Sequence, residues 1–217
     1  MIPTVPRYDI IYEKACAFLQ KIGANSLPVN PFAAIAANGW ALVTYSKLSA
    51  ELPIPATLEE IAEACRSKDG ATVFSGTNYC IAYNETVRVK SRIAFTLMHE
   101  AGHIACGHFD GRHSRSSAGL CLAEYKVLED EANFFAANVL APAAVVTACG
   151  LLTPELLKAA CGISYSAAKS RLPQLNVWQP RPADDAVLRA FSTYIAVTRR
   201  RAGQKFPAIE PDCEMIM

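Results

Sequence analysis

The sequence predicts an α+β fold in which a small antiparallel or mixed sheet is followed by C-terminal helices. In the first half, segments with apolar residues at helical spacing alternate with short runs rich in β-branched and aromatic residues. After Pro142 the pattern is helical again. A chain of 217 residues is long enough for one domain, or for one domain with an appendage.

The elements expected in the first half are helices over 8–22, 31–37 and 57–66 and strands over 40–45, 71–75 and 79–84. The first helix meets Gly23, a typical C-terminal stop, and Pro31 suits the first position of the second. Thr57 and Glu60 have the spacing of a capping box. The last two strands flank a polar turn and predict a hairpin. The strand over 79–84 is an edge-strand candidate for pairing with a peptide, and an interior position is the alternative.

The second half is expected to be helical, with a buried helix around 92–108, a helix over 122–141, a helix–Gly–helix unit over 153–172, a linker over 179–183, a helix over 184–203 and a tail from 204. Three parts follow: 1–147, a helical extension over 148–178, and 179–217. The 153–172 unit is similar to a helix-turn-helix, but only Lys169 and Arg171 would face phosphates. Packing against the first part is therefore favoured over DNA binding.

Composition excludes several classes. The net charge of +1 gives no global field for nucleic acid, so a nucleic-acid partner is not expected. No uninterrupted apolar run approaches the roughly 18–20 residues of a membrane span, and no signal-peptide pattern opens the sequence. The eight cysteines are scattered without a C-x-x-C pair, which argues against a structural zinc site. We expect free thiols in a reducing, cytoplasmic compartment.

One pentapeptide carries chemistry: His99-Glu100-Ala101-Gly102-His103. On a helix, residues four apart point the same way, so His99 and His103 can bind one metal ion. Glu100 then lies beside the metal, where a general base for a metal-bound water belongs. This pattern predicts a zinc hydrolase with one Zn²⁺ per chain and Glu100 as the catalytic residue. A structural pair of histidines is the alternative.

A catalytic zinc needs a third protein ligand. One known scheme takes the third ligand from the same segment, with Gly three residues and His six residues after the second motif His. It does not apply here, because Cys106 and Phe109 occupy those positions. His108 is out of step with it and can only lie near the metal. Cys106 follows His103 by about one turn, where core packing is favoured over a role at the metal.

The helix over 122–141 offers a carboxylate instead. Glu129 and Asn133 share one line on it, so Glu129 as ligand with Asn133 as its support is the preferred geometry. Glu131, Asp130 and Glu124 remain rivals, since clustered acids usually form a solvated face.

These two segments resemble the ImmA/IrrE family of zinc metallo-endopeptidases. The segment 92–103 matches its pattern R-x-x-F-T-x-x-H-E-x-G-H, and 129–142 matches E-x-E-A-N-x-F-A-A-x-L-L-x-P. The departures are Met98 where Ala is common, and Val139-Leu140-Ala141 where Leu-Leu-Met is common. The resemblance implies His99, His103 and Glu129 as zinc ligands, Glu100 as acid/base and a zincin-like peptidase domain. It extends more weakly over 8–175. It also implies that the substrate is a protein, commonly a helix-turn-helix repressor of a mobile element or stress response.

Further candidates surround the motifs. The polar segment 109–119 carries Arg112, His113 and Arg115, which could meet a substrate; a plain surface loop is the default interpretation. His108 and Tyr125 are possible oxyanion partners. The alternative function is a metal-containing regulatory protein that acts by binding a partner or DNA and cuts little.

Overall fold

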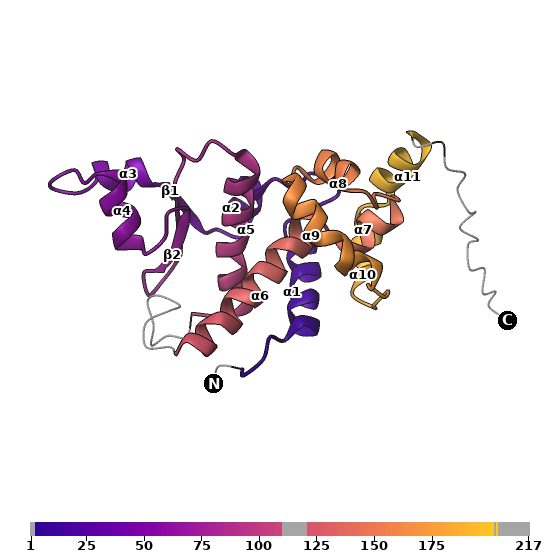
Figure 1. Cartoon of the computed structure of the whole chain (residues 1–217), viewed down its shortest axis with the longest axis horizontal. Coiled ribbons are helices and arrows are strands. Elements are labelled where there is room, and N and C mark those ends of the chain that lie inside the picture. Colours follow the sequence, from indigo (N-terminus) through magenta and orange to yellow (C-terminus); the bar gives the residue numbers. More distant parts are fainter. Residues whose placement is uncertain (1–2, 110–120, 202, 204–217) are drawn as a thin grey trace.

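The computed structural model describes residues 3–109, 121–201 and 203. Its elements are α1 (Tyr8–Lys21), α2 (Pro31–Ala37), β1 (Ala41–Thr44), α3 (Tyr45–Ala50), α4 (Leu58–Cys65), β2 (Gly70–Phe74), β3 (Tyr79–Tyr83), α5 (Lys90–Cys106), α6 (Leu122–Leu140), α7 (Ala143–Ala148), α8 (Pro154–Cys161), α9 (Tyr165–Asn176), α10 (Asp184–Ala190) and α11 (Ser192–Arg201). The sheet with α3 and α4 occupies one end, α1, α5 and α6 the middle, and α7–α11 the other end (Figure 1). The fold is thus α+β, with a small sheet and C-terminal helices.

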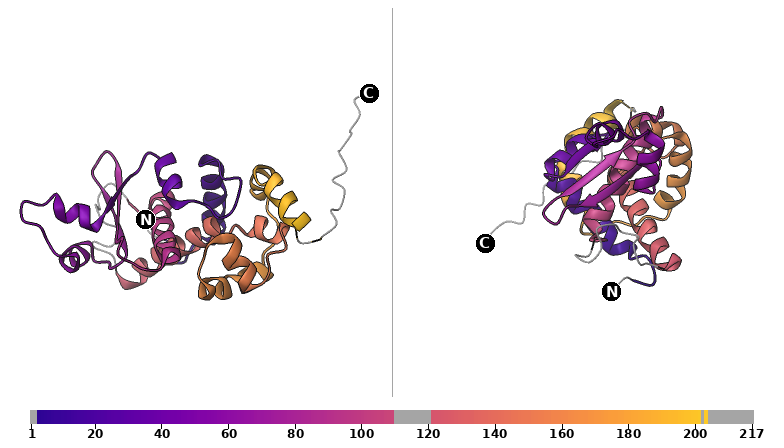
Figure 2. Two further views of the ribbon diagram at one scale, coloured as in Figure 1. Left: turned by 90° about the horizontal axis from the view of Figure 1, so that it is seen from above. Right: turned by 90° about the vertical axis from the view of Figure 1, so that its left-hand side faces the viewer.

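The sheet has three strands in the order β1-β3-β2 and is mixed (Figure 2). β1 runs parallel to β3, and β2 runs antiparallel to it with Thr72 opposite Ile81. The edge position considered for 79–84 is therefore wrong, and the alternative, an interior strand, is confirmed. Ile81 and Ala82 are buried, because this largely apolar strand has a neighbour on each side. β2 is an edge strand instead.

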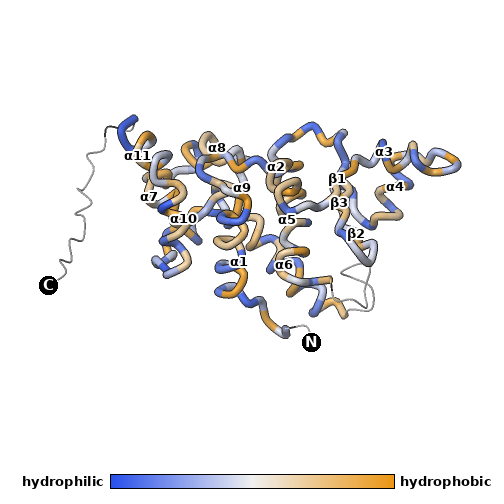
Figure 3. The backbone as a smooth tube through the Cα atoms, turned by 180° about the vertical axis from the view of Figure 1, so that it is seen from behind, coloured by the Kyte–Doolittle hydropathy of each residue, from blue (hydrophilic) through white to orange (hydrophobic). Residues whose placement is uncertain are grey.

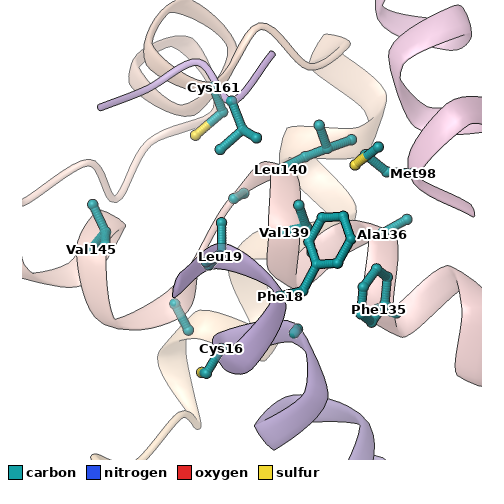
Figure 4. Packing of buried hydrophobic residues seen from close by; sticks show 14 of the residues in the cluster. Cys16, Phe18, Leu19, Met98, Phe135, Ala136, Val139, Leu140, Val145 and Cys161 are labelled. Carbon is teal, nitrogen blue, oxygen red and sulfur yellow. The ribbon is translucent and has the colours of Figure 1, made fainter. Parts of the chain in front are cut away.

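Helices α5 and α6 pack closely at the centre of the molecule. A Cβ on Gly102 would lie 3.1 Å from the carbonyl oxygen of Ala132 and 3.1 Å from Cδ1 of Phe135, so glycine permits this approach. α1 covers the pair, with the rings of Phe18 and Phe135 5.2 Å apart edge to face (Figure 4). The main core extends from Ile11 to Phe191. The boundaries expected at 147/148 and 178/179 stay predictions.

The helix–Gly–helix unit packs against α6. The Thr153 side chain caps α8, and Gly162 ends it with φ +67°. Arg171 of α9 is buried; its Nη2 donates to Oδ1 of Asn138 at 2.6 Å and to the carbonyl of Ala141 at 3.0 Å, at the C-terminal end of α6. One of the two cations that DNA binding would use is thus occupied within the fold, which supports the packing interpretation.

Two elements differ from expectation. Tyr45 starts α3 rather than continuing the strand, because the Thr44 side chain accepts from the Lys47 amide and caps a helix there. The helix expected over 184–203 is two helices that meet at Phe191, whose ring is buried in the core. The hydrophilic end of α11 is visible in Figure 3. Within it, Arg199 donates to the carbonyl of Ala148 on α7.

The stretch Leu122–Ala148 is long and apolar enough, by length and composition only, to cross a membrane, with a mean hydropathy of 1.2. In the fold, 72% of the 18-residue segment of this stretch that meets the criterion is buried inside the protein, as in a core helix. It also carries the carboxylates described below. The stretch Leu122–Ala148 is therefore only weak evidence for a membrane span.

Candidate metal centre

A cavity of about 580 Å³ opens between α5, α6 and the edge strand β2. Its lining includes His99, Glu100 and His103 of α5, together with Tyr125, Glu129 and Asn133 of α6, and residues 71–73 of β2. The cavity shares Phe95 and Asn133 with a second, apolar cavity of about 300 Å³ that extends towards α9. The two helices and the sheet edge therefore place the motif residues in one cleft.

His99, His103 and Glu129 converge on a single point. Their ring Nε2 atoms lie 3.1 Å apart, and the Glu129 carboxylate oxygens lie 3.3 Å from each ring. Ligands held at about 2.0–2.1 Å around a tetrahedral ion are separated by roughly 3.3–3.4 Å. The three donor atoms thus have the spacing of metal ligands, and within the part of the chain that the structure describes they form the only such group.

The hydrogen bonds of His99 direct its lone pair into this cluster. Its Nδ1 lies 2.9 Å from Oδ1 of Asn133. Because that amide oxygen only accepts, Nδ1 carries the proton and Nε2 presents a lone pair to Glu129. Asn133 was expected to support Glu129; it contacts His99 instead.

His103 contacts His108, which is linked in turn to Glu131 and Arg7. Its Nδ1 lies 2.9 Å from Nδ1 of His108, whose Nε2 lies 2.9 Å from Oε2 of Glu131. Arg7 donates to both oxygens of Glu131, each at 2.8 Å. Glu131 therefore faces away from the ligand cluster and is excluded as a rival ligand. His108, a possible oxyanion partner by sequence, is buried and is not among the residues that line the cleft.

The other rivals also lie outside the ligand cluster. Glu124 accepts from the Cys121 amide in the first turn of α6, and Asp130 belongs to no metal-binding group among the described residues. Cys106 is buried in the core, where burial raises the pKa of its thiol to about 12. Arg112, His113 and Arg115 lie outside the described residues.

Glu100 lies beside the ligands without joining them. It is buried, and its Oε2 accepts from Oγ1 of Thr72 at 2.8 Å. Thr72 comes from the edge strand β2, whose close approach to α5 depends on Gly70: a Cβ there would lie 2.7 Å from Cγ2 of Thr96. Sequence reasoning missed Thr72, because nothing in a five-residue strand marks which side chain faces a distant helix.

A family model for the IrrE N-terminal-like domain of M78 peptidases matches residues 54–173. This range covers more than half of the chain and contains every residue of the ligand cluster. The chain belongs to the M78 peptidase family. A comparison with curated proteins found no match. Family and geometry together make this protein a metallopeptidase with a candidate metal site at His99, His103 and Glu129.

Electrostatics in this M78 peptidase suits cation binding. Burial would raise the pKa of Glu129, but the His103 and His99 rings beside it outweigh that effect and hold the pKa far below the usual range. Burial lowers the pKa of His99, yet the carboxylates of Glu129 and Glu100 raise it overall. Burial and the neighbouring His103 lower the pKa of His108 to about 4, so this ring is neutral near pH ~7.

Tyr125 is the remaining residue expected at the site, and the structure brings it to the cleft. It lines the cavity with a partly exposed ring. Burial, followed by the charge of Glu129, raises the pKa of its hydroxyl to about 12. Tyr125 therefore keeps its proton and can donate a hydrogen bond to a bound group.

Proposed function

We propose that the protein is a zinc-dependent endopeptidase in which His99, His103 and Glu129 hold the metal and Glu100 is the acid/base. The observation that carries this proposal is the spacing of 3.1–3.3 Å among the three donor groups, with Glu100 held beside them. The hydrogen-bond partners of both rings leave two lone pairs facing a carboxylate. Such an arrangement is repulsive unless a cation lies between the donors. The donor set of two imidazoles and one carboxylate suits Zn²⁺.

Bound zinc would activate a water molecule and polarise the scissile carbonyl. Glu100 handles the proton: it accepts one from the attacking water and returns it to the leaving amine nitrogen. The Thr72 hydroxyl holds one carboxylate oxygen, which leaves the other to receive that proton. Tyr125 is placed to donate to the substrate carbonyl oxygen.

The substrate, in this proposal, is an extended segment of another protein. Residues 71–73 of the edge strand β2 line the cleft, so a peptide can pair with this edge while its scissile bond faces Glu100. A repressor of helix-turn-helix type, in a transcription-regulating circuit, is the candidate that the family resemblance suggests. Six described cysteines, Cys16, Cys80, Cys106, Cys121, Cys149 and Cys161, form no disulfide, which agrees with the cytoplasmic location we propose.

Metal analysis of the purified protein tests the site. We expect about one zinc per wild-type chain and loss of zinc in Glu129→Ala. The matched control is Asp130→Ala, which removes the neighbouring acid on the same helix and should keep the metal. A wild-type protein that takes up no zinc when zinc is supplied would contradict the proposal.

Turnover is tested separately with Glu100→Gln, which should keep its zinc and lose activity. New protein N-termini generated in a cell extract can be counted by mass spectrometry after adding either form. Glu13→Gln, an exposed carboxylate on α1, is the control that should cut as the wild type does. Equal N-termini from the wild type and Glu100→Gln would favour the alternative, a metal-containing regulatory protein that acts by binding.

A further inference from the structure

Three residues outside the cleft connect one ligand to the N-terminal segment of the chain. Arg7 precedes α1, Glu131 is on α6, and His108 follows the end of α5. They contact one another in series and end on Nδ1 of His103. We call Arg7, Glu131 and His108 the orienting chain.

The nitrogen that carries the proton in each histidine of this series follows from whether the neighbouring group can donate or only accept. The Glu131 carboxylate only accepts, so the 2.9 Å contact requires a proton on Nε2 of His108. A neutral His108 ring then has a lone pair on Nδ1. That lone pair, 2.9 Å from Nδ1 of His103, requires the proton of His103 to be on Nδ1. Nε2 of His103 is therefore left bare and faces Glu129.

Arg7 fixes the far end of the series. Its backbone amide and Nε donate to Oε1 of Glu131, and its Nη2 donates to Oε2, all at 2.8 Å. The paired donors hold the plane of a carboxylate that is fully buried. The carboxylate therefore keeps one orientation, in which its Oε2 accepts from Nε2 of His108.

We propose that the orienting chain holds His103 in the tautomer that binds metal and thereby sets the metal affinity of the site. These are positioning residues, since none of them lines the cleft. The inference rests on the proposed zinc site. The orienting chain differs from the arrangement at His99, where the side-chain amide of Asn133 alone fixes the tautomer of the ring.

Two substitutions at one position provide the test. His108→Leu removes the acceptor for His103. His108→Asn restores one, because Oδ1 of asparagine lies close to where histidine has Nδ1. We expect His108→Leu to bind zinc about 10–100-fold more weakly in competition with a chelator, and His108→Asn to stay within about threefold of the wild type. Equal weakening in both variants would overturn the proposal, as would wild-type affinity in His108→Leu.

Arg7→Met and Arg181→Met form a matched pair at the far end. Each arginine has 37% of its side chain exposed and an ion pair of 2.8 Å, but Arg181 binds Asp9 instead of Glu131. Zinc affinity should fall in Arg7→Met and not in Arg181→Met. An equal effect of the two substitutions would show that the series does not reach the metal.

The tautomers can be observed directly by ¹H–¹⁵N correlation of the histidine side chains, in both metal-free and zinc-loaded wild type. We expect His108 protonated at Nε2 with a bare Nδ1, and His103 protonated at Nδ1. A proton on Nδ1 of His108 would overturn the proposal even if His108→Leu failed to fold. A wild type that binds no zinc would contradict the proposed function, whereas unchanged zinc affinity in His108→Leu would remove the orienting chain alone.

Discussion

Replacing Arg7 with methionine should destabilise the fold in a manner that depends on pH. Burial alone would raise the pKa of Glu131, but the donors of Arg7, together with a smaller contribution from His108, lower it from 4.5 to about 2. That lowering corresponds to roughly 3 kcal/mol of stabilisation at about 1.4 kcal/mol per pKa unit. The Arg7 side chain is 37% exposed, so solvent screens part of the pair, and its backbone amide remains in the variant. We therefore expect a loss of about 2 kcal/mol near pH ~7.

The sign follows from the direction of the pKa change. Because the folded pKa of Glu131 is lower than the unfolded one, its contribution is fully present above pH ~4.5 and is lost as pH falls towards ~2. At pH ~3 less than half of the contribution is left. The difference in free energy of unfolding between wild type and Arg7→Met should therefore shrink by about half or more between pH ~7 and pH ~3.

Urea unfolding followed by circular dichroism measures this difference, with a chelator present so that metal binding adds no stability. Arg181→Met is the control, because its partner Asp9 is 85% exposed and such pairs contribute less than about 1 kcal/mol. The reasoning is refuted if Arg7→Met costs no more than Arg181→Met at pH ~7. It is also refuted if the cost of Arg7→Met is the same at both pH values.

Three further outcomes are expected. Thr72→Val should lower kcat by about 10–100-fold with bound zinc unchanged, since a hydrogen bond to the Glu100 carboxylate contributes roughly 1.5–3 kcal/mol. A kcat equal to that of the wild type in a steady-state assay would contradict this prediction. Gly102→Ala should weaken zinc binding, because the added Cβ pushes α6 away by a few tenths of an ångström. The better helix propensity of alanine, about 1 kcal/mol, should offset the effect of this strain on stability. Calorimetric titration measures the affinity and thermal melts measure the stability, and an unchanged affinity would show that α6 can adjust. Zinc affinity should fall as pH drops below ~7, because the raised pKa of His99 lets protons compete for its lone pair, and titration at several pH values would refute this if affinity stayed constant.

Features set by contacts within one helical turn could be read from the sequence. The His99–His103 pair depends only on helix geometry. The apolar residues of α6 that recur at helical spacing are all buried: Leu128, Ala132, Phe135, Ala136 and Val139. The capping box at Thr57 and the stop at Gly162 are likewise local, and both are present. For these features the chain neighbours supply the interacting groups.

Spacing alone could not choose among the acids of α6. Glu129 and Glu131 are two residues apart and point in different directions, one to the histidine ligands and the other to Arg7. Only the docking of α5 and α1 against α6 decides which carboxylate meets which partner. The position of β3 between two neighbours was open for the same reason.

The sequence by itself determined the helix that carries the two histidines, the helix that carries the acids and the family to which both belong. The tertiary structure decided which carboxylate faces the histidines, that Thr72 holds Glu100, and that Arg7 and His108 support the site from behind. The physical reason is the range of the interactions: helix periodicity acts over about four residues, whereas Arg7 and Glu131 are 124 residues apart and meet only when the helices have packed.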